Sequence, residues 1–62
     1  SYTVPNVVGL SSKEANDLLK LLGLKVNLEG SGYVISQSVL ENTPITDGME
    51  VTLTLNKKFE GW

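Results

Sequence analysis

The side chains that enzymes most often use for catalysis are missing from this sequence. It contains no cysteine and no histidine, so a nucleophile paired with a base would need a lysine or a carboxylate as the base. The arrangement Ser-x-x-Lys does not occur. Without cysteine and histidine, the usual structural zinc sites are also excluded. We therefore expect no catalytic residues, no metal site and no cofactor.

The acidic residues could supply an acid–base pair, because the chain has seven Asp and Glu residues. They are scattered, and four of them fall on faces expected to meet solvent: Glu14, Asp17, Glu29 and Glu50. Their spacing fits no EF-hand calcium loop. The glycine-rich segment 30–32 is not a phosphate-binding loop, because no Gly-Lys-Ser/Thr signature follows it. We interpret the acidic residues as solubilising charge.

Length and charge restrict the class of partner. The chain has 62 residues and a net charge of −2, which fits one small soluble domain. It has five lysines, no arginine and a single adjacent basic pair at Lys57-Lys58, so nucleic acid is not an expected partner. No apolar run approaches the roughly twenty residues of a membrane-spanning helix, and we expect no signal peptide. We expect no direct membrane insertion, although the chain could be a piece of a membrane-anchored protein.

One short amphipathic helix is predicted over residues 11–24. Ser11 can cap its start, and Glu14 can return a bond to the Ser11 main chain, which makes a capping box. An apolar stripe at helical spacing predicts the buried face, and it consists of Ala15, Leu18, Leu19 and Leu22. Gly23 supplies a left-handed stop, after which Leu24 can fold back onto Leu19. Leu21 breaks the stripe and is expected at its edge or in solvent.

Three strands are predicted to provide the surface that this helix needs. Residues 24–29 alternate, with Leu24, Val26 and Leu28 facing inward. Residues 33–39 form the second strand, and either of its faces could be buried, or a β-bulge could switch them midway. Residues 30–32 are of hairpin length and predict that these two strands pair. The third strand alternates clearly, and its inward residues are Val51, Leu53 and Leu55.

The remaining segments connect or extend this unit. Residues 1–6 are expected to be extended, because Val4 precedes a proline, and residues 40–48 form a long connection rich in turn residues. The predicted fold is α+β, with one amphipathic helix packed on a three-stranded, mostly antiparallel sheet. The domain is expected to span residues 1–56, followed by a tail over 57–62. Within the tail, Phe59 is expected to dock partly and Trp62 to stay exposed.

The order and spacing of several residues resemble a PASTA domain from about Val4 to Asn56. The resemblance is carried by four groups of residues: Val4-Pro5-Asn6-Val7 with Gly9; Ala15, Leu18, Leu19 and Gly23-Leu24; Gly32, Val34 and Gln37; and Gly48, Val51 and Leu53. Family members usually have Gln-Ser-Pro and then a glycine after the second strand. Here Val39 replaces the proline and Asn42 stands near the glycine position. Asparagine is the next-best residue for left-handed geometry, so the turn can survive.

The resemblance implies both a fold and a cellular context. It implies a helix on a three-stranded sheet, in a non-catalytic module. Such modules occur in bacterial penicillin-binding proteins and in membrane Ser/Thr kinases of the eukaryotic type, on the outer face of the cytoplasmic membrane. They are proposed to sense uncross-linked peptidoglycan, stem peptides or β-lactams. The parent protein would then be a transpeptidase or a kinase.

Two functions are compatible with this resemblance. The first is weak binding of a muropeptide, a stem peptide or a β-lactam through polar loop atoms, with candidate residues Gln37, Ser38, Glu41, Asn42 and Thr43. The second is a structural module that positions a neighbouring transpeptidase domain without binding ligand. For Gln37, a side chain hydrogen-bonded to nearby main chain is the main alternative to a ligand contact. The expected partners are accordingly peptidoglycan fragments or adjacent domains of the parent protein.

Overall fold

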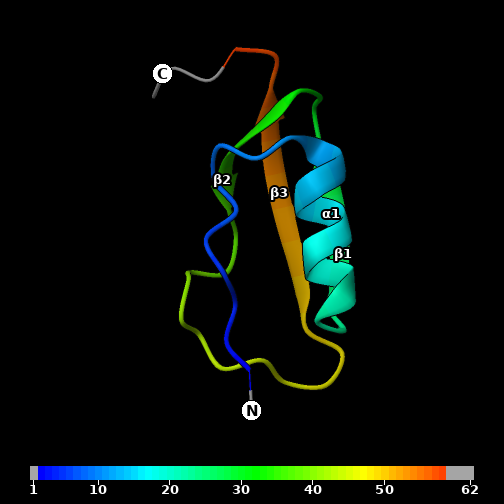
Figure 1. Ribbon diagram of the computed structural model, residues 1–62, viewed down its shortest axis with the longest axis vertical. Coiled ribbons are helices and arrows are strands. Elements are labelled where there is room, and N and C mark those ends of the chain that lie inside the picture. The colour runs from blue at the N-terminus through cyan, green and yellow to red at the C-terminus, as the bar shows by residue number, and fades with distance from the viewer. Residues whose placement is uncertain (1, 59–62) are drawn as a thin grey trace.

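The computed structural model describes residues 2–58 and contains one helix and three strands in that range (Figure 1). The helix α1 spans Ser12–Leu21, and the strands are β1 (Lys25–Glu29), β2 (Tyr33–Gln37) and β3 (Glu50–Asn56). The helix packs on the sheet, so the predicted α+β class is confirmed. Residues 59–62 lie outside the described residues, and the placements expected for Phe59 and Trp62 stay predictions.

The ends of α1 are fixed by the local signals in the sequence. The Ser11 hydroxyl accepts a hydrogen bond from the Glu14 N–H (3.2 Å), and a Glu14 carboxylate oxygen accepts one from the Ser11 N–H (3.2 Å). At the other end, the N–H of Leu24 donates to the Leu19 carbonyl and that of Gly23 to the Lys20 carbonyl. This is the Schellman arrangement, in which a residue with positive φ satisfies the last carbonyls of a helix.

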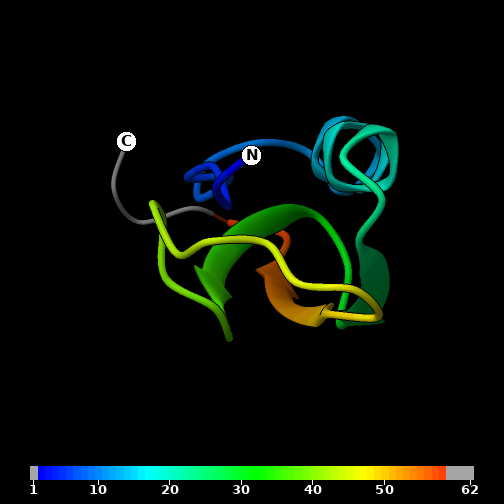
Figure 2. The same cartoon turned by 90° about the horizontal axis from the view of Figure 1, so that it is seen from below.

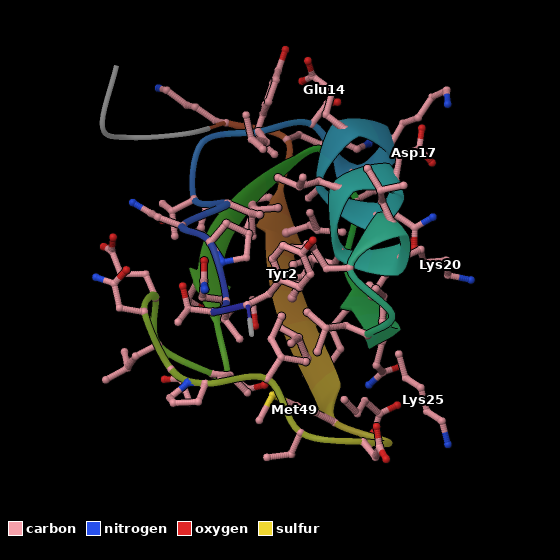
Figure 3. The ribbon with its side chains drawn as sticks, turned by 60° about the horizontal axis from the view of Figure 1, so that its bottom comes forward. Tyr2, Glu14, Asp17, Lys20, Lys25 and Met49 are labelled. Atoms are coloured by element: carbon pink, nitrogen blue, oxygen red, sulfur yellow. The ribbon has the colours of Figure 1, made fainter. Side chains whose placement is uncertain are left out.

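The apolar stripe of α1 faces the sheet as predicted. Ala15 and Leu19 are fully buried, and Leu18 and Leu22 pack partly buried against the core. Leu21, the residue that breaks the stripe, is 84% exposed. The charged residues Asp17 and Lys20 project from α1 away from the sheet (Figure 3). Helical spacing alone therefore predicted which face of α1 is buried.

The sheet is mixed, and its strand order is β1-β3-β2. β1 runs parallel to β3, with Val26 opposite Val51, and β2 runs antiparallel to β3, with Val34 opposite Leu55. The predicted pairing of the first two strands is wrong, because β3 lies between them (Figure 1). The inward residues of β3 are all buried, and only the central position of a three-stranded sheet gives a strand neighbours on both sides.

The segment 30–32 is a close crossing over the end of β3 rather than a hairpin turn. Gly30 and Gly32 have φ values of +92° and +108°. A Cβ atom on Gly30 would collide with the Leu55 carbonyl, and one on Gly32 with the Asn56 carbonyl. The two glycines therefore let the chain leave β1, pass against the carboxyl end of β3 and enter β2 on the far side.

A β-bulge in β2 decides which of its residues face the core. The register shifts between Val34 and Ser36, so Ile35 is an extra residue. Val34 is fully buried and lies opposite the core residue Leu55. Gln37 likewise lies opposite a core residue, Leu53. The bulge therefore turns Val34 and Gln37 to the same face. Of the alternatives considered for this strand, the one in which a β-bulge changes the buried face midway is the one observed.

The outer strand β1 is buried less than predicted. Leu24, just before it, is buried and Val26 is half-buried, but Leu28 is 44% exposed. Leu28 lies opposite the buried Leu53, so it faces the expected side. It is exposed because β1 has a neighbouring strand on one side only.

The N-terminal segment covers the part of the sheet that α1 leaves open. Figure 2 shows this segment and α1 on the same side of the sheet. Val4 and Val7 are fully buried. Main-chain hydrogen bonds join Gly9 and Leu10 to Val34 of β2 (2.8 and 2.9 Å). The core is therefore closed by two pieces, a helix above β1 and an extended segment above β2.

We predict that Leu19→Ala lowers the free energy of unfolding by about 2–5 kcal/mol, as other buried leucine truncations do. Leu18→Ala should cost less, because Leu18 is only partly buried. Leu21→Ala is the matched control on the same helix and should change stability by less than about 0.5 kcal/mol. Urea melts of the three variants measure this, and a Leu21→Ala loss as large as that of Leu19→Ala would contradict the orientation of α1.

A second prediction separates the energetic cost of a left-handed backbone conformation from the cost of a steric clash with a neighbouring strand. Gly23→Ala meets no atom within 4 Å, so it should cost only the left-handed conformation, about 1–2 kcal/mol. Gly32→Ala adds a collision with the Asn56 carbonyl and should cost about 3 kcal/mol or more. Thermal or urea unfolding of both variants gives the comparison. Equal losses would show that the crossing of 30–32 over β3 is not tight.

Candidate functional site

The five residues predicted to bind ligand lie together, at the end of β2 and in the loop that follows it. Gln37 is the last residue of β2, and Ser38, Glu41, Asn42 and Thr43 belong to the connection toward β3. This loop runs beside the N-terminal segment, where Thr3 and Pro44 form an isolated bridge. These residues therefore lie in one region of the surface, and several of them make hydrogen bonds that hold the domain together.

The side chain of Gln37 makes three hydrogen bonds to main-chain groups. Its Oε1 accepts from the Val7 N–H (2.9 Å), and its Nε2 donates to the carbonyls of Pro5 (3.0 Å) and Val39 (2.8 Å). The bonds to Val7 and Pro5 reach two residues that are two positions apart on the N-terminal segment. The C=O and N–H of one residue in a neighbouring strand would make the same pair of bonds. The Gln37 carboxamide therefore takes the place of a peptide group between β2 and this segment.

Ser38 extends the pairing of β2 with β3. Its N–H donates to the Thr52 carbonyl (2.9 Å), and its hydroxyl oxygen accepts from the Thr52 N–H (2.8 Å). The hydroxyl thereby replaces the main-chain carbonyl that would accept this bond in a regular ladder. Ser38 is exposed, so its oxygen also lies at the surface.

Asn42 and Thr43 hold the N-terminal segment through their main chains. The Asn42 N–H donates to the Val4 carbonyl (2.7 Å), and the Val4 N–H donates to the Thr43 carbonyl (2.8 Å). Asn42 has a φ of +69°, which confirms that it takes the left-handed geometry expected where relatives have glycine. The turn therefore keeps its shape although the glycine is missing.

A shallow groove of about 390 Å³ lies where the N-terminal segment, β2 and the following loop meet. We call it the edge groove. It is lined by Asn6, Val8, Ile35, Ser36, Gln37, Leu40 and Glu41. Only Gln37 and Glu41 belong to the set predicted from sequence, and Ser38, Asn42 and Thr43 do not line it. The structure thus adds five residues that sequence reasoning missed.

Three of the five residues that sequence reasoning missed are apolar, and the sequence alone does not distinguish them from other exposed apolar residues. Val8 follows the buried Val7 and begins a turn, in which the Leu10 N–H donates to the Val7 carbonyl (3.1 Å). Ile35 is the extra residue of the bulge, and Leu40 lies in a loop and is 76% exposed. Each of the three is an exposed apolar residue, and the groove brings them together.

The chemistry of the edge groove is that of a binding surface. Glu41 is the only ionisable residue that lines it, and no ion pair involving Glu41 occurs among residues 2–58. The ion pair that the structure shows in this range lies on α1, away from the groove, and joins Lys13 to Asp17 (2.6 Å). The hydrogen bond between these two side chains raises the pKa of Lys13. Within the described residues, no cluster of three acidic residues could hold a metal ion. The groove therefore offers contacts and one negative charge, without a nucleophile–base pair.

The family model of the PASTA domain matches residues 2–57. The chain belongs to the PASTA family. PASTA domains are non-catalytic, so the chain is not itself an enzyme, and the family is associated with extracytoplasmic, cell-wall-related proteins. No curated protein matches this chain. In the part that the structure describes, no helix is long and apolar enough to cross a membrane.

This PASTA domain departs from the usual Gln-Ser-Pro motif at Val39, and the structure shows what the residue there does. The Val39 carbonyl accepts one of the three Gln37 bonds, and every residue type supplies a carbonyl. The Val39 side chain also packs partly buried against the core. The role of Gln37 is therefore kept without the proline.

We predict that Gln37→Ala lowers the free energy of unfolding by about 2–5 kcal/mol, because it leaves the Val7 N–H and two carbonyls without partners. Ser38→Ala removes a single acceptor at an exposed position and should cost about 1 kcal/mol. Urea melts compare the two variants. A Gln37→Ala loss no larger than that of Ser38→Ala would contradict the bridging role of the carboxamide.

The variant Gln37→Glu gives a pH-dependent version of this test. The introduced carboxylate would face the carbonyls of Pro5 and Val39, which raises the pKa of this carboxyl in the folded state above its usual value of about 4.3. The protonated form can donate to one of the carbonyls. The variant should therefore approach wild-type stability below about pH 4 and lose it as pH rises through the raised pKa. An equal deficit at pH 4 and pH 7 would contradict this arrangement.

Proposed function

We propose that this PASTA domain is an extracytoplasmic module of a penicillin-binding protein or a membrane Ser/Thr kinase, and that it binds uncross-linked peptidoglycan weakly. The ligand would be a muropeptide or stem peptide, with a β-lactam as a further candidate. The observation that carries the proposal is the edge groove, because it places exposed apolar side chains beside polar ones on a domain of a cell-wall-related family.

The edge groove and the adjoining loop together form the proposed binding surface. Gln37 and Glu41 line the groove, while Ser38, Asn42 and Thr43 flank it in the sequence and would contact a ligand that extends beyond it. Val8, Ile35 and Leu40 supply apolar contact. The groove is small and open, so we expect affinity no tighter than about micromolar, equivalent to roughly −8 kcal/mol.

A second candidate function rests on a different observation. The main chains of Asn42 and Thr43 and the side chain of Gln37 hold the N-terminal segment in place. A module whose polar residues serve its own fold in this way suits a structural role, in which it positions a neighbouring transpeptidase domain without binding ligand. The two functions differ in a measurable way, because only the first requires the groove to take up a ligand.

Titration of the ¹⁵N-labelled domain with a muropeptide tests the proposal. We expect the amide signals of Asn6, Val8, Ile35, Ser36 and Glu41 to shift first, while those of Lys25 and Asn27 on β1 stay in place. No shift at millimolar muropeptide would favour the structural function.

A matched pair of leucine variants tests the location of the site. Leu40→Ala removes exposed apolar surface from the groove and should weaken binding about threefold to tenfold, because it deletes several methyl and methylene contacts. Leu21→Ala removes the same side chain from an exposed position on α1 and should leave affinity unchanged. Equal effects of the two variants would place the ligand elsewhere on the domain.

A further inference from the structure

The outer edge of β1 carries main-chain groups that the sheet leaves open. β1 is an outer strand, and β3 is its one neighbouring strand among residues 2–58. The Lys25 N–H donates to the Met49 carbonyl (3.0 Å), so the main chain at residue 25 points toward β3. Because main-chain groups alternate in direction along a strand, every second residue of β1 bonds toward β3. The N–H and C=O groups of the residues between them, Val26 and Leu28, therefore point to the open edge.

No segment of the described chain pairs with this edge. The isolated bridges found among residues 2–58 lie at the N-terminal segment and at the start of β2, away from β1. In the same range, no hydrogen bond from outside the sheet reaches the main chain of Val26 or Leu28. Leu28 is also 44% exposed. A strand edge with open main-chain groups and exposed apolar surface is a template for a further strand.

The sequence of β1 fits a second copy of itself that runs in the opposite direction. A two-fold axis through Asn27 would place Val26 opposite Leu28 of the second copy. It would also place Lys25 opposite Glu29 of the second copy, and each of these pairs would occur twice. Val26 and Leu28 of the second copy would exchange both main-chain bonds, as residues in a hydrogen-bonded antiparallel pair do. This register therefore uses the open groups of both residues in each copy.

Opposite charges meet in this register, which favours a second copy of the chain over other strands. Lys25 and Glu29 are exposed, and neither has an ion-pair partner among the described residues. They would form non-hydrogen-bonded pairs, in which side chains of neighbouring strands come closest. Opposite charges directly across two strands are stabilising, and like charges are destabilising. A lysine on an outer strand usually discourages pairing, but in this register each Lys25 meets a carboxylate.

The other face of the joined strands would cover apolar surface. Leu28 faces the side of the sheet on which α1 lies, because it is opposite the buried Leu53, and Val26 shares that side. Each exposed Leu28 would lie beside Val26 of the second copy. α1 lies over β1 (Figure 2), so the two-fold axis would bring the two copies of α1 to the same side of the joined sheets, in antiparallel directions.

We infer that the outer edge of β1 is a self-association surface, through which two copies of this domain join their sheets into one. Val26 and Leu28 supply the main-chain bonds, and Lys25 pairs with Glu29 of the second copy. The inference goes beyond the proposed function and does not depend on it, because the edge groove lies at β2, the opposite outer strand. One short strand from each copy makes a small interface, so we expect a dissociation constant of about 0.1–1 mM.

A dilution series of the whole ¹⁵N-labelled chain tests for this dimer. Dilution from about 2 mM to about 0.05 mM spans the expected dissociation constant, and it should shift the amide signals of Val26 and Leu28. Hydrogen exchange of these two amides should be slower at the high concentration, because their N–H groups then donate to the second copy. The amide signals of Ile35 and Ser36, on the opposite outer strand, should stay in place. Translational diffusion should become faster on dilution.

Charge reversals test the register. Lys25→Glu and Glu29→Lys each replace two opposite-charge pairs with two like-charge pairs, so each should weaken association about tenfold. A mixture of the two variants should associate as the original chain does, because one variant then carries acidic residues and the other basic residues at both positions. The double variant Lys25→Glu/Glu29→Lys should also associate. Lys57→Glu is the matched control, because it makes the same change in net charge at an exposed position after β3, and it should leave association unchanged.

Each part of the inference can be overturned separately. A chain that stays monomeric at about 2 mM, above the expected dissociation constant, would overturn the whole inference. Shifts of Ile35 and Ser36 on dilution, with Val26 and Leu28 unchanged, would place self-association at β2 instead of β1. A mixture of the two charge variants that fails to associate, or a Lys57→Glu effect as large as that of Lys25→Glu, would overturn the pairing of lysine with glutamate across the two copies.

Discussion

The bridge made by the Gln37 carboxamide is the interaction on which the N-terminal part of the core depends. Val4 and Val7 are fully buried, and the segment that carries them includes Pro5, which has no N–H to donate. A regular strand ladder cannot form there, so the Val7 N–H and the Pro5 carbonyl need other partners. The cost of leaving them unpaired is of the same order as the stabilisation from burying one apolar side chain. One glutamine side chain supplies both partners.

The bulge at Ile35 is what makes this bridge geometrically possible. Without an extra residue, strict alternation would place Gln37 on the side opposite Val34. The register shift turns both to the core face, where Gln37 meets the N-terminal segment. The same shift leaves Ile35 exposed beside Val8. The β-bulge that lets Gln37 close the core therefore also forms part of the edge groove. This is why Gln37 belongs both to the fold and to the candidate site.

Local signals in the sequence predicted the local structure well. The capping box, the helical stripe and the stop at Gly23 required only neighbouring residues, and the alternation of β3 required only its own. The pairing of β1 with β2 was predicted wrongly, because the glycines at 30 and 32 signal a tight turn but not which strand the turn crosses. The edge groove could not be derived either, because exposed apolar residues such as Leu40 and Leu21 look alike until the fold places one of them in a groove.

The central position of β3 has a consequence for how the domain is made. β3 is the last strand in the chain and the middle strand of the sheet. In the completed sheet β1 and β2 stand two strand spacings apart, about 9–10 Å, so they have no strand to pair with until residues 50–56 are available. A chain synthesised from its N-terminus therefore cannot complete this sheet early. This topology therefore delays completion of the fold until nearly the whole domain has been synthesised.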